Sequence, residues 1–226
     1  MSNKIRGAVV DDHPIVLCGL RKALEDEGIE VLGAVNSPSE LLTLLTNAAC
    51  DVVIADYSMP GDKALDGWRF IASVSSEHPK LPILVYSEFD DPFLVGTLAQ
   101  RGLAGFVSKH DDMHEVSSAV RALVAESRFM SSIARSALDQ FSALRQWRRF
   151  NMLSRRQMEV AGLMLCGMSV CETTRLLHRR INTIIAQRSE VCKRLGFSGQ
   201  SEMVRFAIGH GLWLERSHAS FELRPA

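Results

Sequence analysis

A short apolar run that ends in an acid and is then broken by a Pro-Gly pair constrains this chain more than any other feature. Residues 51–62 read DVVIADYSMPGD, so the run Val52–Ala55 is followed directly by Asp56. A short run of Val, Val and Ile favours a buried strand over a helix. Asp56 is then expected at the carboxyl end of a strand, where open α/β sheets place their ligand sites.

A second apolar run, Ala8–Val10, also ends in acids, Asp11 and Asp12. If the two strands are parallel neighbours, three carboxylates meet at one rim, which is costly unless a cation neutralises them. Oxygen ligands of this kind suit Mg²⁺, and a carboxylate held by Mg²⁺ can attack phosphorus to form an aspartyl phosphate. In the alternative, each acid merely caps a helix or starts a turn. That alternative explains a single Asp at one strand end better than it explains matched acids at the ends of two strands.

Two later apolar runs are followed by side chains that can bind a phosphoryl group. Residues 81–86 precede Ser87, and residues 105–108 precede Lys109. A hydroxyl and an ammonium at the same rim can bind phosphoryl oxygens. Taken singly, they are an ordinary loop serine and an ordinary surface lysine. Glu88 follows Ser87 and would repel or crowd a phosphodonor unless it points to solvent.

Charge divides the chain into two halves, although the formal net charge of the whole chain is zero. Residues 1–127 hold 10 Lys and Arg against 19 Asp and Glu, a net charge of −9, and residues 128–226 hold 16 against 7, a net charge of +9. In the acidic half, apolar runs alternate with amphipathic helices, which predicts a doubly wound parallel sheet of five strands. An acidic half joined to a basic half indicates a signalling module and a nucleic-acid-binding module.

The basic half has the start and stop signals of a small helical unit. Ser154 with Gln157 and Ser169 with Glu172 form two capping boxes, and Gly196 is a typical end for a later helix. A tight turn at residues 178–180 separates two of the helices, which predicts a helix-turn-helix. Residues 128–150 are interpreted as a linker helix followed by a basic hinge, with a dimerisation surface as the alternative.

The acidic half resembles the receiver domain of a two-component response regulator over about the first 127 residues. The residues that carry this resemblance are Asp11-Asp12, Asp56, Ser87 and Lys109, in this order and spacing. The resemblance implies a flavodoxin-like fold, Asp56 as the phosphoacceptor, and Mg²⁺ bound by Asp11, Asp12, Asp56 and the backbone carbonyl of Ser58. It also places Ser87 and Phe106 at switch positions and Lys109 at the position of the phosphoryl-binding lysine.

Two further segments are similar to the NarL/FixJ class, and especially to its Rcs-type capsule regulators. They are Asp11-Asp12-His13-Pro14 and the loop that contains Gly61-Asp62-Lys63. The basic half resembles the LuxR-type output domain over about 65 residues, on the basis of Leu153-Ser154, Glu159-Val160, Gly167, Glu172, Leu177, Thr183-Ile184, Lys193 to Gly196, and Glu202. This resemblance implies that the helix Asn182–Leu195 enters the major groove of double-stranded DNA.

The recognition helix departs from the family pattern. The DNA-binding candidates are Arg179, Arg180, Thr183, Ile185, Ala186, Arg188, Ser189 and Lys193. On a helical wheel Ile185, Ala186 and Ser189 face outward, but they cannot make the bidentate guanine contact of Arg or Lys. The phosphate contacts, which give affinity more than specificity, are then expected from Arg179, Arg180, Thr183, Arg188 and Lys193. Thr173 and Thr174 replace the usual apolar pair in the preceding helix.

These resemblances divide the chain into a receiver (1–127), a linker helix and hinge (128–150), a helix-turn-helix domain (151–216) and a tail (217–226). We expect a transcriptional regulator that is phosphorylated on Asp56 by a histidine kinase or phosphotransfer protein and forms a homodimer on phosphorylation. The alternative is a regulator that acts mainly through protein contacts, by pairing with another regulator or sequestering a kinase. An enzyme is not expected, because haloacid dehalogenase-type phosphatases carry a second Asp where this chain has Ser58.

The cysteines and the hydropathy bear on the compartment. None of the five cysteines forms a CxxC pair, and Cys18 and Cys50 lie among apolar residues. We interpret them as buried, reduced thiols of a cytoplasmic protein. The chain enters a strand within a few residues, so no signal peptide is expected, and no apolar run approaches the ~20 residues that span a membrane.

Overall fold

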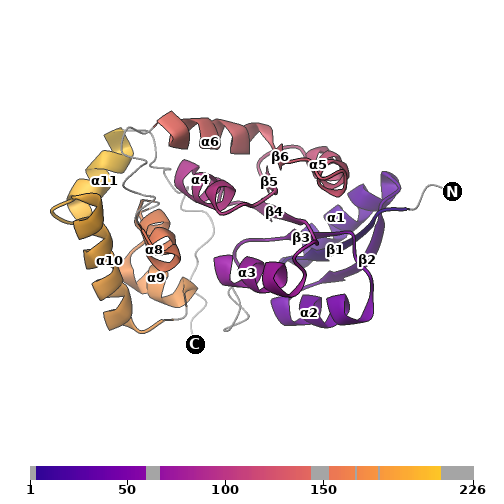
Figure 1. The fold of residues 1–226 in the computed structure, drawn as a ribbon, viewed down its shortest axis with the longest axis horizontal. Helices are drawn as coiled ribbons and strands as arrows, with labels where there is room; N and C mark the ends of the chain where they lie inside the picture. Colours follow the sequence, from indigo (N-terminus) through magenta and orange to yellow (C-terminus); the bar gives the residue numbers. More distant parts are fainter. Residues whose placement is uncertain (1–3, 60–66, 144–152, 166, 178, 210–226) are drawn as a thin grey trace.

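The computed structural model describes residues 4–59, 67–143, 153–165, 167–177 and 179–209 (Figure 1). Within these ranges a sheet covered by helices is followed by a smaller cluster of helices at the other end of the molecule. The predicted loop at Gly61-Asp62-Lys63, most of the predicted basic hinge and the tail at 217–226 lie outside the described residues.

The sheet is parallel, and its strand order is β2-β1-β3-β4-β5-β6. The strands are β1 (Arg6–Val10), β2 (Glu30–Val35), β3 (Val52–Ala55), β4 (Ile83–Ser87), β5 (Gly105–Ser108) and β6 (Phe129–Met130). The predicted parallel sheet is confirmed, but the prediction of five strands is wrong by one. The two residues of β6 are too few to give an apolar pattern, and they become a strand only by pairing with Gly105 and Phe106 of β5.

Helices cover both faces of the sheet. Two of them, α1 (Pro14–Asp26) and α5 (His114–Val124), share one apolar core with the sheet, and α2 (Pro38–Asn47), α3 (Trp68–Glu77), α4 (Pro92–Gln100) and α6 (Ser132–Ala143) share the other. The leucines of α1 recur at helical spacing, and Leu20 and Leu24 are buried against the sheet. This is the doubly wound arrangement that the sequence predicts.

Helix α6 lies where the sequence predicts a linker helix, and it packs along α4 (Figure 1). Its Ala134 and Ala137 are buried in the core beside α4, so α6 is part of the receiver's packing and not a free connection. Phe141 packs edge-on against Phe93 of α4, with 5.7 Å between ring centroids. Gly96 of α4 makes this possible, because a Cβ at that position would lie 2.2 Å from the Phe141 ring.

The basic half forms the predicted helical unit, which in the described residues consists of α8 (Arg155–Leu165), α9 (Val170–Leu176), α10 (Ile181–Leu195) and α11 (Gln200–Gly209). Both predicted capping boxes are present: at the start of α9, Ser169 Oγ accepts from the Glu172 N–H at 3.2 Å and Glu172 Oε2 accepts from the Ser169 N–H at 2.7 Å. Helix α10 ends at Gly196, whose φ of 78° is left-handed. Local capping chemistry therefore sets the ends of these helices.

The cysteine interpretation is corrected at one position. Cys18 is exposed, because α1 directs Leu17, Leu20 and Leu24 to the sheet and Cys18 falls on the outer face. Cys50 is half-buried, and the four described cysteines, Cys18, Cys50, Cys171 and Cys192, are free thiols. In the described ranges no helix has both the length and the apolar character that a membrane crossing needs.

Candidate functional site

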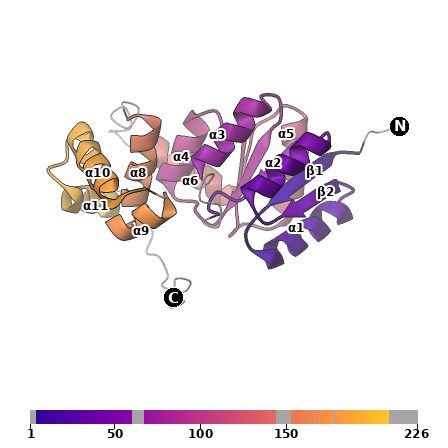
Figure 2. The ribbon, with the colours of Figure 1, turned by 90° about the horizontal axis from the view of Figure 1, so that it is seen from below.

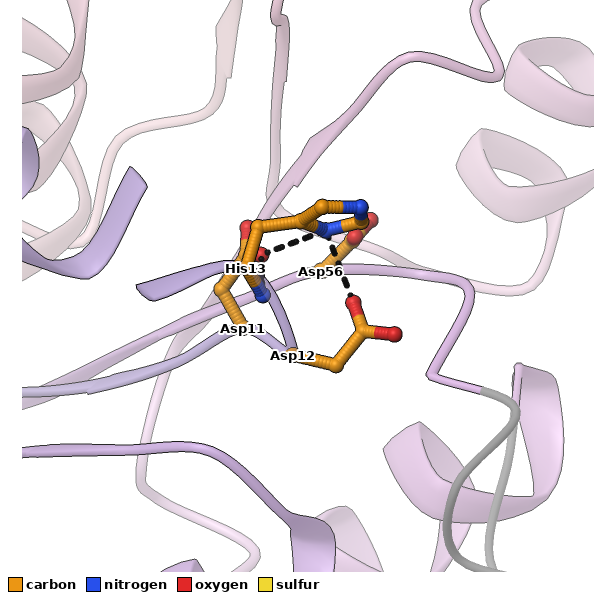
Figure 3. Close-up of side chains that lie close together, drawn as sticks. All are labelled: Asp11, Asp12, His13 and Asp56. Atoms are coloured by element: carbon orange, nitrogen blue, oxygen red, sulfur yellow. Dashed lines mark hydrogen bonds and ion pairs between the residues drawn. The ribbon is translucent and has the colours of Figure 1, made fainter. Parts of the chain in front are cut away.

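The ends of β1 and β3 bring together the acids that the sequence places there. The two strands pair in register with Val10 opposite Ala55, so Asp11 and Asp56 leave the sheet side by side. One ligand atom from each of Asp11, Asp12, His13 and Asp56 lies within 4.8 Å of the others (Figure 3). We call these four residues the acidic rim.

Lys109 connects two of the carboxylates of the acidic rim. Its Nζ lies 2.7 Å from Asp11 Oδ2 and 2.8 Å from Asp56 Oδ2, and all three side chains are nearly buried. Burial acts to lower the pKa of Lys109, but the Asp56 and Asp11 carboxylates outweigh it and the pKa is raised. Burial raises the pKa of Asp56, and Lys109 only partly opposes this. One ammonium therefore balances two buried carboxylates.

The backbone that follows Asp56 holds its other oxygen. The Tyr57 N–H donates to Asp56 Oδ1 at 2.6 Å, and the Ser58 N–H lies 3.4 Å from the same atom. The carboxylate is thus held on one side by backbone N–H groups and on the other by Lys109. This fixes its orientation at the rim before any ligand binds.

His13 belongs to the rim, although the sequence predicts no ligand role for it. Its Nδ1 lies 2.9 Å from Asp12 Oδ1 and 3.2 Å from Asp11 Oδ1, as the dashed lines in Figure 3 show. Its backbone N–H also donates to Asp11 Oδ1, at 2.9 Å. The signal in the sequence was its position directly after the acidic pair.

Ser87 and Lys109 lie at the same rim, because Ser87 of β4 pairs with Ser108 of β5 and the Lys109 N–H donates to the Ser87 carbonyl at 2.9 Å. The Ser87 hydroxyl is buried and accepts from the Phe89 N–H at 3.2 Å. Phe106 is fully buried in the core that α4 and α6 share with the sheet. Glu88 is exposed, which agrees with the alternative in which it points to solvent.

A second polar cluster lies beside Lys109 and was missed from the sequence. Asp90 Oδ2 accepts a hydrogen bond from Ser108 Oγ and lies 2.9 Å from His110 Nδ1. The two residues that flank Lys109 are therefore tied to the loop that follows Ser87. Ser, His and Asp are common surface residues, and only the pairing of β4 with β5 brings these three together.

The outer face of α10 carries two large apolar side chains in its first half. Ile181 and Ile185 lie one turn apart and are 46% and 50% exposed. The predicted DNA-facing residues that are exposed are Arg180, Thr183, Ile185, Ala186, Ser189 and Lys193. Figures 1 and 2 show that α10 lies on the side of the helical unit that faces away from the sheet.

The position of Arg188 differs from the expectation that it faces outward to phosphates. Its side chain is only 5% exposed, and its Nη1 donates to the Met168 carbonyl at 3.0 Å and lies 3.5 Å from Thr173 Oγ1. Arg188 is one turn beyond the buried Ile184, so the helix directs it into the core. Burial lowers its pKa. The unusual Thr173, which is fully buried, thus has a polar partner on α10.

Arg179 is also engaged within the protein. Its Nη1 donates to Gln187 Oε1 at 3.3 Å, and its Nη2 lies 3.9 Å from Glu159 Oε2. Its side chain is nearly buried, whereas the neighbouring Arg180 is exposed. Of the two arginines in the turn, Arg180 is the one available to solvent.

Comparison with known proteins assigns the family. The response regulator receiver domain family matches residues 8–121. The response regulator UvrY of Escherichia coli K12 is 32% identical over 207 residues, which covers 90% of this chain and 94% of UvrY. The chain belongs to the two-component response regulators. The transcriptional regulatory protein RcsB of Escherichia coli K12 is 30% identical over 205 residues, which covers 90% of this regulator and 94% of RcsB.

A solved structure shows the same fold over nearly the whole regulator. It contains two RcsB dimers bound to two parallel DNAs, and it matches with a TM-score of 0.61 and 30% identity over 90% of this chain and 98% of that one. The resemblance to the response regulators, and to their Rcs-type members, is thereby confirmed.

In this response regulator the receiver and the helical unit meet through α4 and α8. A Cβ added at Gly162 of α8 would lie 3.0 Å from Phe93 of α4, which indicates close approach of the two helices. A cavity of about 40 Å³ beside this contact is lined by Tyr57 and Phe89, among others. Tyr57 follows Asp56, and Phe89 follows Ser87 by two residues, so both loops of the rim reach the boundary between the domains.

Proposed function

We propose that Asp56 accepts a phosphoryl group from a histidine kinase or phosphotransfer protein. The observation that carries this proposal is the Lys109 ammonium, which bridges Asp11 and Asp56 at 2.7 and 2.8 Å. The donor set also fits Mg²⁺, because hard carboxylate oxygens gather at a rim where one cation already balances two acids. Asp11, Asp12, Asp56 and the backbone carbonyl of Ser58 would hold the ion.

In the proposed step an Asp56 carboxylate oxygen attacks phosphorus, and the P–N bond of the donor's phosphohistidine breaks. The ring nitrogen keeps the electron pair and takes a proton from the solvent. Lys109 and Ser87 bind phosphoryl oxygens, and bound Mg²⁺ supplies the positive charge that offsets those oxygens. Water later attacks the phosphorus, the P–O bond to Asp56 breaks, and inorganic phosphate leaves while the carboxylate is restored. This is modification of the protein itself and not turnover of an outside substrate.

Phosphorylation then shifts the regulator between two states. A phosphoryl group on Asp56 competes with Asp11 for Lys109 and draws Ser87 inward. The Phe106 side chain then changes its position, because it packs in the same core as α4. The change reaches the helical unit through the contact of α4 with α8.

The test of the phosphoacceptor is labelling with radioactive acetyl phosphate in the presence of Mg²⁺. We expect Asp56→Asn to abolish labelling, because the amide is a poor nucleophile. Asp51→Asn is the matched control, because Asp51 directly precedes β3, at the end of the strand opposite to Asp56, where it accepts from the Arg6 N–H at 2.8 Å. Labelling of Asp56→Asn at the level of the parent would refute the assignment.

We also propose that this regulator binds double-stranded DNA as a homodimer on phosphorylation, with α10 in the major groove. The exposed Arg180 and Lys193 contact phosphates, and Ile185, Ala186 and Ser189 face the bases. Thr183 lies near the DNA backbone, and Arg179 contacts DNA only if its ion pair with Glu159 breaks. Arg188 is left out of this proposal because it is buried. The RcsB dimers on DNA support the proposal by analogy.

Selection of random duplex DNA by the full-length protein tests this proposal, with and without acetyl phosphate and Mg²⁺. We expect two half-sites about one helical turn apart, recovered more strongly with the phosphodonor. Recovery without the phosphodonor at equal strength would separate DNA binding from Asp56.

A second candidate function is action mainly through protein contacts. The observation that favours it is the exposure of large apolar side chains on the helical unit, since Ile185 of α10 and Ile208 of α11 are 50% and 57% exposed. Under this candidate the selection recovers no motif in either condition. A salt-dependent, sequence-selective gel shift would argue against it.

A further inference from the structure

We infer that the first two turns of α10 read thymine 5-methyl groups, with Ile185 as the main contact, so that this regulator selects A·T pairs at the centre of each half-site. The inference deepens the proposed DNA binding and rests on it. It concerns which base is read, which neither the fold nor the family decides.

The first observation is the exposure of two large apolar side chains on one ridge. Ile181 and Ile185 are one turn apart, and about half of each side chain is exposed. The N-terminal part of a recognition helix is the part that contacts base edges. In the major groove, the one apolar group that a base pair presents is the thymine methyl. An exposed isoleucine at this place therefore matches that group and no other base edge.

The second observation is the lack of a guanine reader in the same segment. Among residues 181–189 the exposed side chains are Ile181, Asn182, Thr183, Ile185, Ala186 and Ser189, and none is cationic. Arg188 is the one cation in that segment, and its buried guanidinium is bonded to the Met168 carbonyl. The bidentate contact of Arg or Lys with guanine is thus excluded there.

Asn182 completes the match. It is exposed and lies three residues before Ile185, on the same side of the helix. An Asn amide makes a bidentate hydrogen-bonded contact with adenine, the base that pairs with thymine. A helix that presents an amide beside an isoleucine can therefore address both bases of one A·T pair.

The cations lie at the edges of this surface. Arg180 precedes the helix and Lys193 lies in its last turn, and both are exposed. At these places they suit the phosphates on either side of the groove and leave the centre neutral. The cations that flank the exposed neutral side chains of residues 181–189 thus supply affinity, and the neutral side chains between them select the base.

The test uses a half-site recovered by the full-length protein, with each thymine replaced in turn by deoxyuridine. This replacement removes the 5-methyl group and keeps every hydrogen-bonding group of the base. We expect the affinity to fall about four-fold at one or two positions, the change that corresponds to ~0.8 kcal/mol for one buried methyl group.

Ile185→Ala should bind the thymine duplex more weakly and respond no further to deoxyuridine at those positions. Ile208→Ala is the control, because it removes a similarly exposed isoleucine from α11 and should keep the full four-fold response. A guanine-centred half-site, equal binding of the deoxyuridine duplexes, or an undiminished response of Ile185→Ala would overturn the inference. Recovery of no duplex at all would instead refute the DNA-binding proposal, and this inference with it.

Discussion

At the scale of single residues, the charge balance of the acidic rim depends on Lys109. Its ammonium contacts Asp11 and Asp56 where both carboxylates are nearly out of solvent. A buried charge that loses its partner is far more costly than an exposed ion pair that is broken. If Asp56 accepts a phosphoryl group as proposed, stability and phosphoryl binding therefore depend on the same lysine.

We predict that Lys109→Ala lowers the free energy of unfolding by about 3–5 kcal/mol in the presence of EDTA, because two buried carboxylates are left unpaired. Mg²⁺ should restore part of the loss. Urea unfolding with and without Mg²⁺ measures both effects. Lys22→Ala is the control, since Lys22 forms an exposed pair with Asp26 and should change the stability by less than ~0.5 kcal/mol. Equal losses for the two variants would contradict the prediction.

A second prediction concerns pH. Because folding raises the pKa of Asp56 above 3.8, the stability linked to its proton is fully present below the unfolded value. It is lost as the pH rises through the folded value, so the ionised carboxylate destabilises the fold at neutral pH. Without metal, Asp56→Asn should therefore be more stable than the parent at about pH 7, and the difference should shrink as the pH falls. Urea midpoints across the acid range test this, and a difference independent of pH would count against it.

At the scale of elements, the receiver is completed by the packing of α6 on α4. Gly96 leaves room for the Phe141 ring, and Phe141 in turn meets Phe93. Helix α6, which follows β6, thus becomes part of the receiver core by a contact between two helices. The role of Gly96 is steric, because this position in α4 would favour alanine on helix propensity alone.

We predict that Gly96→Ala lowers the free energy of unfolding by about 1–3 kcal/mol, the usual cost of overpacking. Gly199→Ala is the matched control, since a Cβ at that position meets nothing within 4 Å. The double variant Gly96→Ala with Phe141→Leu should recover part of the loss. Thermal unfolding of the three variants decides the matter, and an unchanged stability of Gly96→Ala would contradict the close packing of the two helices.

At the scale of the whole molecule, the two domains share an apolar core. Phe93 and Phe141 of the receiver belong to the same buried cluster as Met158, Ala161 and Met164 of α8. The contact leaves α10 on the far side of the helical unit (Figure 1). In this arrangement the receiver packs against α8 and leaves the outer face of α10 uncovered.

We predict that Gly162→Leu separates the domains, because even a Cβ at this position would lie 3.0 Å from Phe93. The radius of gyration measured by small-angle scattering should increase, while the helix content stays that of the parent. Arg156→Leu places the same side chain at an exposed position of α8 and should leave the radius unchanged. An unchanged radius for Gly162→Leu would contradict the prediction, because the interface would then accommodate the leucine side chain without separation of the domains.

Local signals in the sequence determined much of the fold and the site. The apolar runs that end in Asp11, Asp56, Ser87 and Lys109 predicted both the parallel sheet and the rim at which these residues meet. The capping boxes and Gly196 predicted the ends of helices in the basic half. Such features could be predicted because they depend on residues close together in the chain, or on the rule that parallel strands end at one edge.

The tertiary structure alone decided the features that depend on distant partners. β6 exists because β5 offers an edge, and Arg188 is buried because Met168 and Thr173 receive its guanidinium. Asp90 meets His110 because β4 pairs with β5. In each case the residue has several acceptable environments on its own, and the choice depends on a contact between segments that only folding brings together.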